Sequence, residues 1–381
     1  MAYELSEEQE ALRAQIQQMA VEKVAPRAAE IDREGDFPWD MQKLLAENEL
    51  LGLSIPEEYG GSGASLLSNC IVAEELARAC ATTSLIFVVQ KLAAYPIVLA
   101  GSEEIKQKYL PPLARGEVLA AFCLTERGAG SDAAATKTTA VETDDGYLLN
   151  GEKCFITNGS IADTFSTFTM TDIDRGVRGI SAFVVEKEFP GFSVGPVEDK
   201  MGLRGAQVSE VKFEDCLVPK ENMLGERGSG FITAMKTLDS SRPLVGAQAV
   251  GIAQGALDVA VGWAREREQF GSSIGKLQGI QFMLADMKTR VEAARQLVYR
   301  SATLCDNNDP ELSLFSAMSK LFASDMAMSV TADAVQVLGG YGYMKDQPLE
   351  RMMRDAKVTQ IYEGTNQVQR VVVARRLLGK L

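Results

Sequence analysis

The sequence contains no histidine in its 381 residues. This absence excludes a Ser-His-Asp triad, a Cys-His dyad, a histidine-ligated zinc and a histidine general base. The six cysteines are scattered and none forms a C-x-x-C pair, which indicates a reduced cytosolic setting and no metal site. Acid–base chemistry is therefore left to carboxylates, Lys, Tyr, Cys or a cofactor. Demanding chemistry without histidine or a metal cluster favours an organic cofactor.

The sequence also lacks any apolar run that approaches the roughly 20 residues needed to span a bilayer. The segment 1–10 is polar and acidic, which fits neither a signal peptide nor a basic transit peptide. The net charge of −13 makes nucleic acid and anionic membranes poor partners. We therefore expect a cytoplasmic, bacterial protein with no membrane insertion. With 46% hydrophobic residues, the chain can build two or three domains with a large core.

Composition divides the chain into three zones. Residues 1–118 show helical apolar spacing and a capping-box pattern at Ser6. Residues 119–228 contain short runs of β-branched and aromatic residues separated by Gly, Pro, Asp and Asn, which predict an antiparallel β domain, either a small barrel or a sandwich. Residues 229–381 contain long apolar stripes that predict a helical bundle. No G-x-G-x-x-G follows a strand, so a Rossmann nucleotide site is not supported.

The segment 246–264 carries four glycines among its alanines. These are Gly246, Gly251, Gly255 and Gly262. Each glycine costs about 1 kcal/mol against alanine in a helix interior, so their number predicts another helix backbone packed closely against this one. Pro243 suits the first position of this helix. We therefore expect Arg242 at a helix N-terminus, where it would serve as an anion clamp.

One carboxylate near the C-terminus has surroundings that suit a general base. Glu363 lies between Tyr362 and Gly364. Apolar cover from Ile361 and Tyr362 disfavours the charged carboxylate and raises its pKa, while Gly364 lets the backbone turn tightly and lets a ligand approach. Such a glutamate is suited to abstract a proton from a weakly acidic C–H. A solvated glutamate in a surface turn is the alternative for this segment taken alone.

Four other segments offer groups for a flat ring or a phosphate. The loop 122–132 supplies two glycines, two hydroxyls and free backbone N–H groups, as an ordinary Gly-Ser turn also would. In 155–159, Phe155 can stack on a ring and Thr157 can bond it, or the two are a core Phe and a turn Thr. The segment 265–271 offers an arginine fork for a diphosphate, or only charges that complement a helix dipole. The glycines of 336–343 either cap a helix or admit a cofactor to the backbone.

Together and in this order, these segments resemble the acyl-CoA dehydrogenase family over essentially the whole chain. The shared motifs are L-T-E-x-G-A-G-S-D, F-I-T-N-G, R-E-Q-F-G, Q-V-L-G-G-Y-G-Y, R-D-A-K and I-Y-E-G-T. The pattern is closest to short- and medium-chain members of the butyryl-CoA type. The resemblance implies a helical N-terminal domain at 1–118, a middle antiparallel β-barrel or sandwich at 119–228 and a C-terminal four-helix bundle at 229–381.

The resemblance also implies the chemistry. It implies FAD, a coenzyme A thioester and removal of two hydrogens across the α and β carbons, with Glu363 taking the α-proton. Some branches place their base just before the arginine of the C-terminal bundle, where this chain has Ser241, which cannot serve. The resemblance further implies a homotetramer built as a dimer of dimers. It also implies that electrons leave to an electron-transfer flavoprotein.

The resemblance assigns binding roles residue by residue. Some of the cofactor contacts would reach the FAD of a neighbouring subunit. The residues that resemble cofactor contacts are Phe122, Leu124, Thr125, Gly130, Ser131, Phe155, Ile156, Thr157, Arg267, Phe270, Gln278, Gln336, Val337, Leu338, Gly339, Gly340, Thr365, Asn366 and Gln367. Those that resemble substrate contacts are Ser131, Asp239, Arg242, Tyr362 and Gly364.

Several positions depart from the family pattern. Arg127 replaces a usual proline, and we interpret it as a solvated side chain rather than a group that alters the flavin potential or meets the substrate. Gln90 and Lys91 fall in the helix that closes the acyl pocket, where we expect Lys91 to snorkel to the surface rather than meet a polar acyl tail. Thr83 replaces the arginine of glutaryl-CoA members, which argues against a glutaryl substrate.

The acyl group and the direction of the reaction stay open at this stage. Short linear, branched and alicyclic chains all fit the motifs, and so does an enoyl-CoA reductase. A flavin oxidase or monooxygenase on the same fold is disfavoured, because those branches lack the Y-E-G-T glutamate or carry long extra domains. A non-catalytic scaffold is the third class of function.

Overall fold

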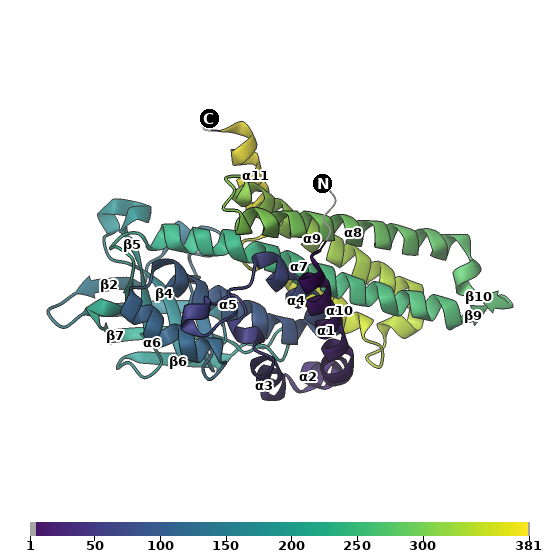
Figure 1. The fold of residues 1–381 in the computed structure, drawn as a ribbon, viewed down its shortest axis with the longest axis horizontal. Coiled ribbons are helices and arrows are strands. Elements are labelled where there is room, and N and C mark those ends of the chain that lie inside the picture. Colours follow the sequence, from purple (N-terminus) through teal and green to yellow (C-terminus); the bar gives the residue numbers. More distant parts are fainter. Residues whose placement is uncertain (1–4, 380–381) are drawn as a thin grey trace.

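Serine side chains begin three helices of the N-terminal part. In the computed structural model, which describes residues 5–379, Ser6 forms the predicted capping box with Gln9, and Ser65 and Ser102 cap two later helices. The helices of this part are α1 (Glu7–Met19), α2 (Ala28–Glu34), α3 (Trp39–Glu47), α4 (Leu66–Ala79), α5 (Ala81–Ala100) and α6 (Glu103–Ala114). Helices α4 and α5 pack against the long helices that follow the β domain (Figure 1).

The middle of the chain forms one mixed eight-stranded sheet within the described residues. Its strands are β1 (Ala120–Cys123), β2 (Thr139–Glu142), β3 (Tyr147–Thr157), β4 (Thr164–Met170), β5 (Ile180–Glu186), β6 (Phe192–Val197), β7 (Val208–Val218) and β8 (Met223–Leu224), in the order β6-β7-β3-β2-β4-β5-β8 with β1 beside β4. Most neighbours run antiparallel as predicted, but β1 and β2 each pair with β4 in parallel. The purely antiparallel prediction is wrong there because residues 124–138 lead from β1 to β2 without a hairpin between them. This connection contains most of the predicted flavin segment 122–132, which we call the flavin-type loop.

The C-terminal part is helical, as predicted. It comprises α7 (Gly230–Glu266), α8 (Gln278–Asp306), α9 (Leu312–Leu338), α10 (Leu349–Thr359) and α11 (Asn366–Leu378), with a hairpin of β9 (Glu268–Gln269) and β10 (Ser272–Ser273) after α7. The three long helices pack on one another, α10 packs against both α7 and α9, and α11 packs against α9 (Figure 1).

The predicted start of α7 at Pro243 is wrong, because the helix begins at Gly230 and Pro243 lies inside it. A proline in a helix cannot donate a hydrogen bond to the carbonyl four residues earlier. That carbonyl belongs to Asp239, and the hydroxyl of Ser316 on α9 donates to it at 2.7 Å. Arg242 is therefore a buried mid-helix residue and not an N-terminal anion clamp.

The prediction that another helix backbone packs closely against the glycines of α7 is confirmed at two of the four positions. A Cβ on Gly251 would lie 2.1 Å from the carbonyl oxygen of Glu74, and one on Gly255 would lie 2.3 Å from that of Arg78, so both glycines face the backbone of α4. At Gly246 the nearest atom is a methyl carbon of Val298 on α8, at 2.8 Å. At Gly262 a Cβ would meet nothing within 4 Å, so the prediction is wrong for this residue.

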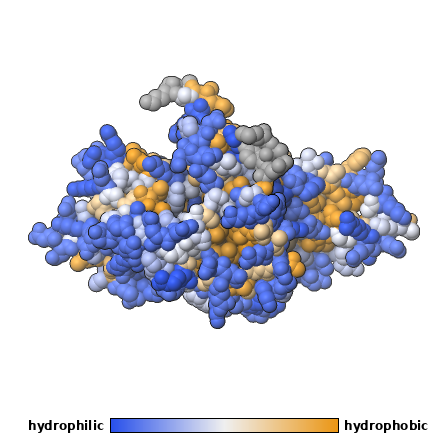
Figure 2. All heavy atoms as spheres, viewed as in Figure 1, coloured by the Kyte–Doolittle hydropathy of each residue, from blue (hydrophilic) through white to orange (hydrophobic). Residues whose placement is uncertain are grey.

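Two helices, α5 and α7, are long and apolar enough to cross a membrane by length and composition. The expectation that no run reaches this length is therefore wrong. In each helix 78% of the apolar window is buried inside the protein, so the apolar surface already has protein partners. The visible face of the molecule is largely hydrophilic with scattered apolar patches (Figure 2).

Replacing Gly251 with alanine tests the contact between α7 and α4. We expect Gly251→Ala to lower the free energy of unfolding by about 1–3 kcal/mol, because the new methyl group forces two helix backbones apart. The matched control is Gly262→Ala, which adds the same methyl group in open space and is expected to raise stability by up to about 1 kcal/mol. Urea denaturation of both variants measures the difference, and equal effects would contradict the assigned packing.

Candidate active site

Glu363 lies on a left-handed turn between α10 and α11. Its φ angle is 52°, which is costly for a residue with a side chain, and that of Gly364 is 93°, which glycine adopts freely. The Glu363 carboxylate accepts a hydrogen bond from the hydroxyl of Ser241 on α7. Its backbone N–H has no acceptor among the described residues. The turn therefore presents one carboxylate and one free donor side by side.

The two carbonyl groups of this turn point at side chains from three helices. Arg242 on α7 donates its Nε to the carbonyl of Glu363 at 3.3 Å, and Gln369 on α11 donates to the same oxygen at 3.3 Å. Gln369 and Lys320, the latter on α9, each donate to the carbonyl of Gly364 at 2.9 Å. All three donors are buried. The position of Glu363 is therefore set from inside the helical domain.

Burial raises the pKa of Glu363 above its usual range. The hydrogen bond from Ser241 and the charges of Arg242, Lys91 and Lys320 act in the opposite direction, but they do not reverse the shift. Beside it, Tyr362 donates its hydroxyl to Gln248, and burial raises the pKa of this phenol well above its usual value. The raised pKa expected for Glu363 is thus present in the folded chain, but Ile361 is 51% exposed, so the apolar cover expected from that side chain is not.

Arg242 and Asp239, the residues expected to hold the coenzyme A portion, form an ion pair one helical turn apart. The Nη1 of Arg242 lies 2.7 Å from Oδ1 of Asp239. Burial lowers the pKa of the arginine and raises that of the aspartate, and their mutual attraction opposes both shifts. Through Arg242, which also donates to the carbonyl of Glu363, this ion pair is linked to the turn.

The loop after β1 is held by a buried ion pair that sequence reasoning missed. Lys153 on β3 donates to Glu126 at 2.8 Å and to the carbonyl of Leu124 at 3.1 Å. Glu126 also accepts from the backbone N–H groups of Lys137 and Thr138. Although burial opposes it, the charge of Lys153 and these hydrogen bonds lower the pKa of Glu126 to about 2. Glu126 belongs to the T-E-x-G motif, which marked the loop as a candidate site. Lys153 belongs to no such motif, so the sequence did not indicate its role.

This loop offers unused donors on an open face. The backbone N–H groups of Gly128, Gly130 and Ser131 have no acceptor among the described residues. A Cβ on either glycine would meet nothing within 4 Å. Thr125 is half-buried, and Ser131 is exposed at the end of the loop. The segment can therefore approach a polar planar ring closely, as predicted.

The second predicted flavin segment lies directly beside this loop. The N–H of Cys154 donates to the carbonyl of Thr125 at 2.9 Å, so β3 and the loop are neighbours. Phe155 interrupts the pairing of β3 with β7, has a φ angle of 57° and exposes 67% of its surface, while Ile156 is buried and Thr157 is half-buried. An exposed aromatic ring on a strained backbone lacks a protein partner, and a ligand ring could supply one.

Helix α5 connects the loop with the turn that carries Glu363. Gln90 donates to the carbonyl of Val118 and accepts from the N–H of Ala120, at the start of β1. Its neighbour Lys91 donates to the hydroxyl and the carbonyl of Ser240, next to Ser241. The expectation that Lys91 snorkels to the surface is wrong, because the side chain is buried and its ammonium group finds both of these hydrogen-bond acceptors inside the protein.

Arg127 lies at the surface. Its side chain is 75% exposed and pairs with Glu210, as expected for a solvated residue.

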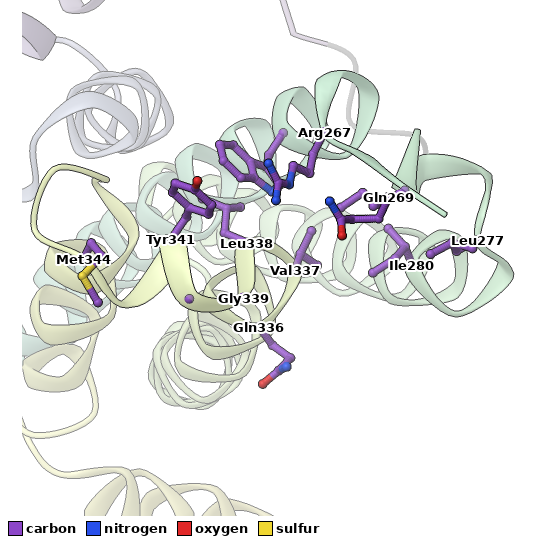
Figure 3. Close-up of a pocket in the computed structure, with 13 residues that line it drawn as sticks. Arg267, Gln269, Leu277, Ile280, Gln336, Val337, Leu338, Gly339, Tyr341 and Met344 are labelled. Carbon is purple, nitrogen blue, oxygen red and sulfur yellow. The ribbon is translucent and has the colours of Figure 1, made fainter. Parts of the chain in front are cut away.

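A second group of predicted cofactor residues forms a hollow of about 570 Å³ at the far end of α7. Arg267 and the segment Gln336 to Gly340 line it, together with Trp263 and Tyr341 (Figure 3). The guanidinium of Arg267 packs over both aromatic rings, at 5.9 and 5.3 Å from their centroids. The side chain of Gln336 extends away from this group (Figure 3).

Two other predicted contacts lie near the hollow without lining it. Phe270 forms the turn of the β9–β10 hairpin with 91% of its surface exposed, and Gln278 is exposed at the start of α8. With a rise of about 1.5 Å per residue, Arg267 lies about 37 Å along α7 from Arg242, and Gln336 lies about 24 Å along α9 from Lys320. The structure therefore does not bring this group together with Glu363 in one chain.

The three residues after Gly364 have different surroundings. Thr365 caps α11 through the N–H of Val368, and Gln367 is exposed. The side chain of Asn366 is buried and bonded to Lys320, Ser324 and Asp325. A cofactor contact at Asn366 would therefore have to use its backbone.

Comparison with known proteins identifies the family. Models of the acyl-CoA dehydrogenase N-terminal, middle and C-terminal domains match residues 6–117, 121–216 and 228–378. The chain belongs to the acyl-CoA dehydrogenase family. It is an enzyme of FAD-dependent acyl-CoA dehydrogenation, and the predicted three-domain fold is confirmed.

Similar proteins cover nearly the whole chain. A Mycobacterium tuberculosis protein named "Probable acyl-CoA dehydrogenase FadE25" is 51% identical over 99% of this chain and 97% of its own length. A cyclohex-1-ene-1-carbonyl-CoA dehydrogenase from Syntrophus aciditrophicus is 50% identical over 98% and 91%. The solved structure of butyryl-CoA dehydrogenase from Megasphaera elsdenii superposes with a TM-score of 0.96 at 45% identity, over 99% of this chain and 100% of that one.

The residues of this chain fit the cofactor of the family. A solved FAD complex of PigA matches with a TM-score of 0.94 at 31% identity, over 99% of both chains, so members of this fold bind FAD. Here the open glycines and free N–H groups of the loop 127–131 suit the polar edge of a flavin, and exposed Phe155 suits its face. The hollow at Arg267 suits the remainder of a dinucleotide.

Removing the buried cation of the flavin-type loop should disturb both stability and cofactor retention. We expect Lys153→Met to lower the free energy of unfolding by about 3–5 kcal/mol, because Glu126 is left as an unpaired buried charge. Urea denaturation measures the loss, and the flavin absorbance of the purified protein should fall with it. The matched control, Lys153→Met with Glu126→Gln, removes both charges and should recover part of the stability. Equal stability of the single and double variants would show that the pair is not coupled.

Proposed function

We propose that Glu363 is the base that takes the α-proton of an acyl-CoA thioester, giving the trans-2-enoyl-CoA product. The observation that carries this proposal is the geometry of the turn: a carboxylate with a raised pKa beside a free backbone N–H, held by buried donors. Ser241 occupies the position where some branches of the family place the base, and a hydroxyl cannot replace a carboxylate there. Bound FAD supplies the acceptor for the hydride that leaves the β carbon.

The residues of the chain act on the proton and on the thioester. A thioester α-proton is too weakly acidic for a carboxylate in water, so the site has to stabilise the enolate. The free N–H of Glu363 can donate to the thioester oxygen, and one donor of this type is typically worth about 3–4 kcal/mol. Tyr362 and the buried surroundings exclude water, which raises the basicity of Glu363. We also assign Asp239, Arg242 and Ser131 to binding of the coenzyme A portion, as the family resemblance implies.

The proposal extends to a homotetramer arranged as a dimer of dimers. It is supported by the two separated groups of cofactor residues, since the hollow at Arg267 is about 37 Å along α7 from Arg242. The hollow of one chain would then complete the FAD site of its neighbour, with Phe270 at the adenine. Exposed apolar residues in this region, such as Leu277 and Phe282, would be covered in the assembly. Electrons leave to an electron-transfer flavoprotein, and the enzyme acts in the cytoplasm.

For the substrate we propose a short acyl chain, as named for the similar butyryl-CoA dehydrogenase. Support comes from Gln90 and Lys91 on α5, the helix expected to close the acyl pocket. Both are buried polar residues. A long alkyl chain would have to pack against an ammonium group, and that costs desolvation energy. An alicyclic substrate is the second candidate, because the 50% identical relative is named for cyclohex-1-ene-1-carbonyl-CoA.

Replacing the proposed base tests the chemistry directly. Glu363→Gln keeps the size and the turn but cannot accept the proton, so we expect at least a 1,000-fold loss of turnover, on the order of the loss seen for essential proton-transfer groups. Anaerobic bleaching of the flavin by butyryl-CoA is the measurement. The flavin content of the variant serves as the control and should match that of the wild type. Bleaching at the wild-type rate would exclude Glu363 as the base.

Replacing Lys91 tests the limit on chain length. We expect Lys91→Met to raise the kcat/KM ratio of hexanoyl-CoA over butyryl-CoA by roughly 10- to 100-fold, because each methylene then meets an apolar wall. The same panel should include a cyclohexanecarbonyl ester. An unchanged preference in a folded, flavin-loaded variant would show that Lys91 does not limit the pocket.

A further inference from the structure

Lys320 is a fully buried lysine on α9 that takes no direct part in the proposed proton abstraction. Its Nζ lies 2.9 Å from the carbonyl oxygen of Gly364 and 2.9 Å from Oδ1 of Asn366. Both acceptors belong to the segment that follows the proposed base. Burying an ammonium group is expensive, so its placement under this one turn calls for a physical reason.

The turn itself supplies that reason. The left-handed conformation of Glu363 is costly and persists only where the surroundings over-determine it, whereas Gly364 adopts a positive φ freely. Arg242 and Gln369 bind the carbonyl of Glu363, while Lys320 and Gln369 bind that of Gly364. Only Lys320 adds a charge-assisted hydrogen bond to the Gly364 peptide, and such bonds are roughly twice as strong as neutral ones. Since these donors fix both carbonyl groups, they also fix the backbone that carries the carboxylate and the N–H of Glu363.

We propose that Lys320 is a positioning residue for proton abstraction: its ammonium group fixes the Gly364 carbonyl and thereby the turn that presents Glu363. This inference rests on the proposed role of Glu363 as the base. A misplacement of about 1 Å at a reacting group can cost a rate factor of about 100, so a small relaxation of the turn has a measurable effect.

Lys320 also acts on Glu363 through its charge. The charged groups that face it are Glu363 from the turn, Arg242 from α7 and Asp325 from its own helix, and Arg370 on α11 pairs with Asp325. Burial lowers the pKa of Lys320 to about 7, so the ammonium form is complete at mildly acidic pH. There its charge lowers the pKa of Glu363. Removing the charge should therefore raise the pKa of the base and move the acidic limb of the kcat–pH profile to higher pH.

A variant without the ammonium group leaves no acceptor unpaired. The carbonyl of Gly364 keeps its bond to Gln369, and Oδ1 of Asn366 keeps its bond to Ser324. We therefore expect Lys320→Met to fold and to retain flavin. Lys320→Gln, which keeps a donor but no charge, carries the same test should the methionine variant fail to fold.

The test compares Lys320→Met with Lys320→Arg, which keeps the charge. We expect the methionine variant to lose 10- to 100-fold in kcat, on the order of a 1 Å misplacement, with KM changed less than twofold. The acidic limb should move to higher pH, and arginine should restore both quantities in part. Lys43→Met, at an exposed position on α3, is the matched control and should behave as wild type. A methionine variant with wild-type kcat and an unmoved acidic limb would overturn the proposal.

A second readout isolates the proton step from transfer of the hydride. The ester 3,3-dimethylbutyryl-CoA has α-protons but no β-hydrogen, so its exchange with solvent deuterium reports proton abstraction alone. We expect slower exchange with Lys320→Met and none above background with Glu363→Gln. Wild-type exchange in the lysine variant, with none in the glutamate variant, would overturn only the role of Lys320. Wild-type exchange in the glutamate variant would overturn the proposed base itself.

Discussion

The left-handed turn at Glu363 and Gly364 is the constraint on which the rest of the site depends. Its two carbonyl groups are held by side chains from α7, α9 and α11, so the position of the base is a property of how three helices pack. That packing is itself specified by sequence details far from the turn. Pro243 leaves the carbonyl of Asp239 without its helical partner, and Ser316 of α9 supplies the missing donor, which fixes the register of two of these helices.

The flavin-type loop and the base belong to different domains, and α5 couples them. Gln90 holds the first residues of β1, which lead into the loop, while Lys91 holds Ser240 beside the hydroxyl that contacts Glu363. The hydroxyl of Ser166 on β4 bonds the carbonyl of Ala93 one turn further along. Contacts with α5 thus fix the position of the loop relative to the turn that carries Glu363.

Local motifs predicted the three-domain fold and the region of the base, because short-range signals determine them. The capping box at Ser6 and the Y-E-G-T turn need only a few neighbouring residues. What escaped prediction depends on tertiary contacts. Pro243 is a helix-start signal by propensity, and only the serine on another helix lets it stand in an interior. Lys91, Lys153 and Lys320 are buried, against the usual preference of lysine for the surface, and no local pattern distinguishes them from solvated lysines.

Two of these buried lysines, Lys91 and Lys320, act on the pKa of the proposed base in this chain without histidine. Desolvation raises the pKa of Glu363, while Ser241, Arg242, Lys91 and Lys320 limit the rise. Desolvation alone would raise the pKa further and favour the protonated form, which cannot accept a proton. In contact with solvent the carboxylate would have the lower pKa of an ordinary surface carboxylate and would be a weaker base. Buried cations and a hydroxyl thus oppose the effect of desolvation on this one carboxylate. In a chain without histidine, such opposing effects tune the pKa of the group to which the proposed proton abstraction falls.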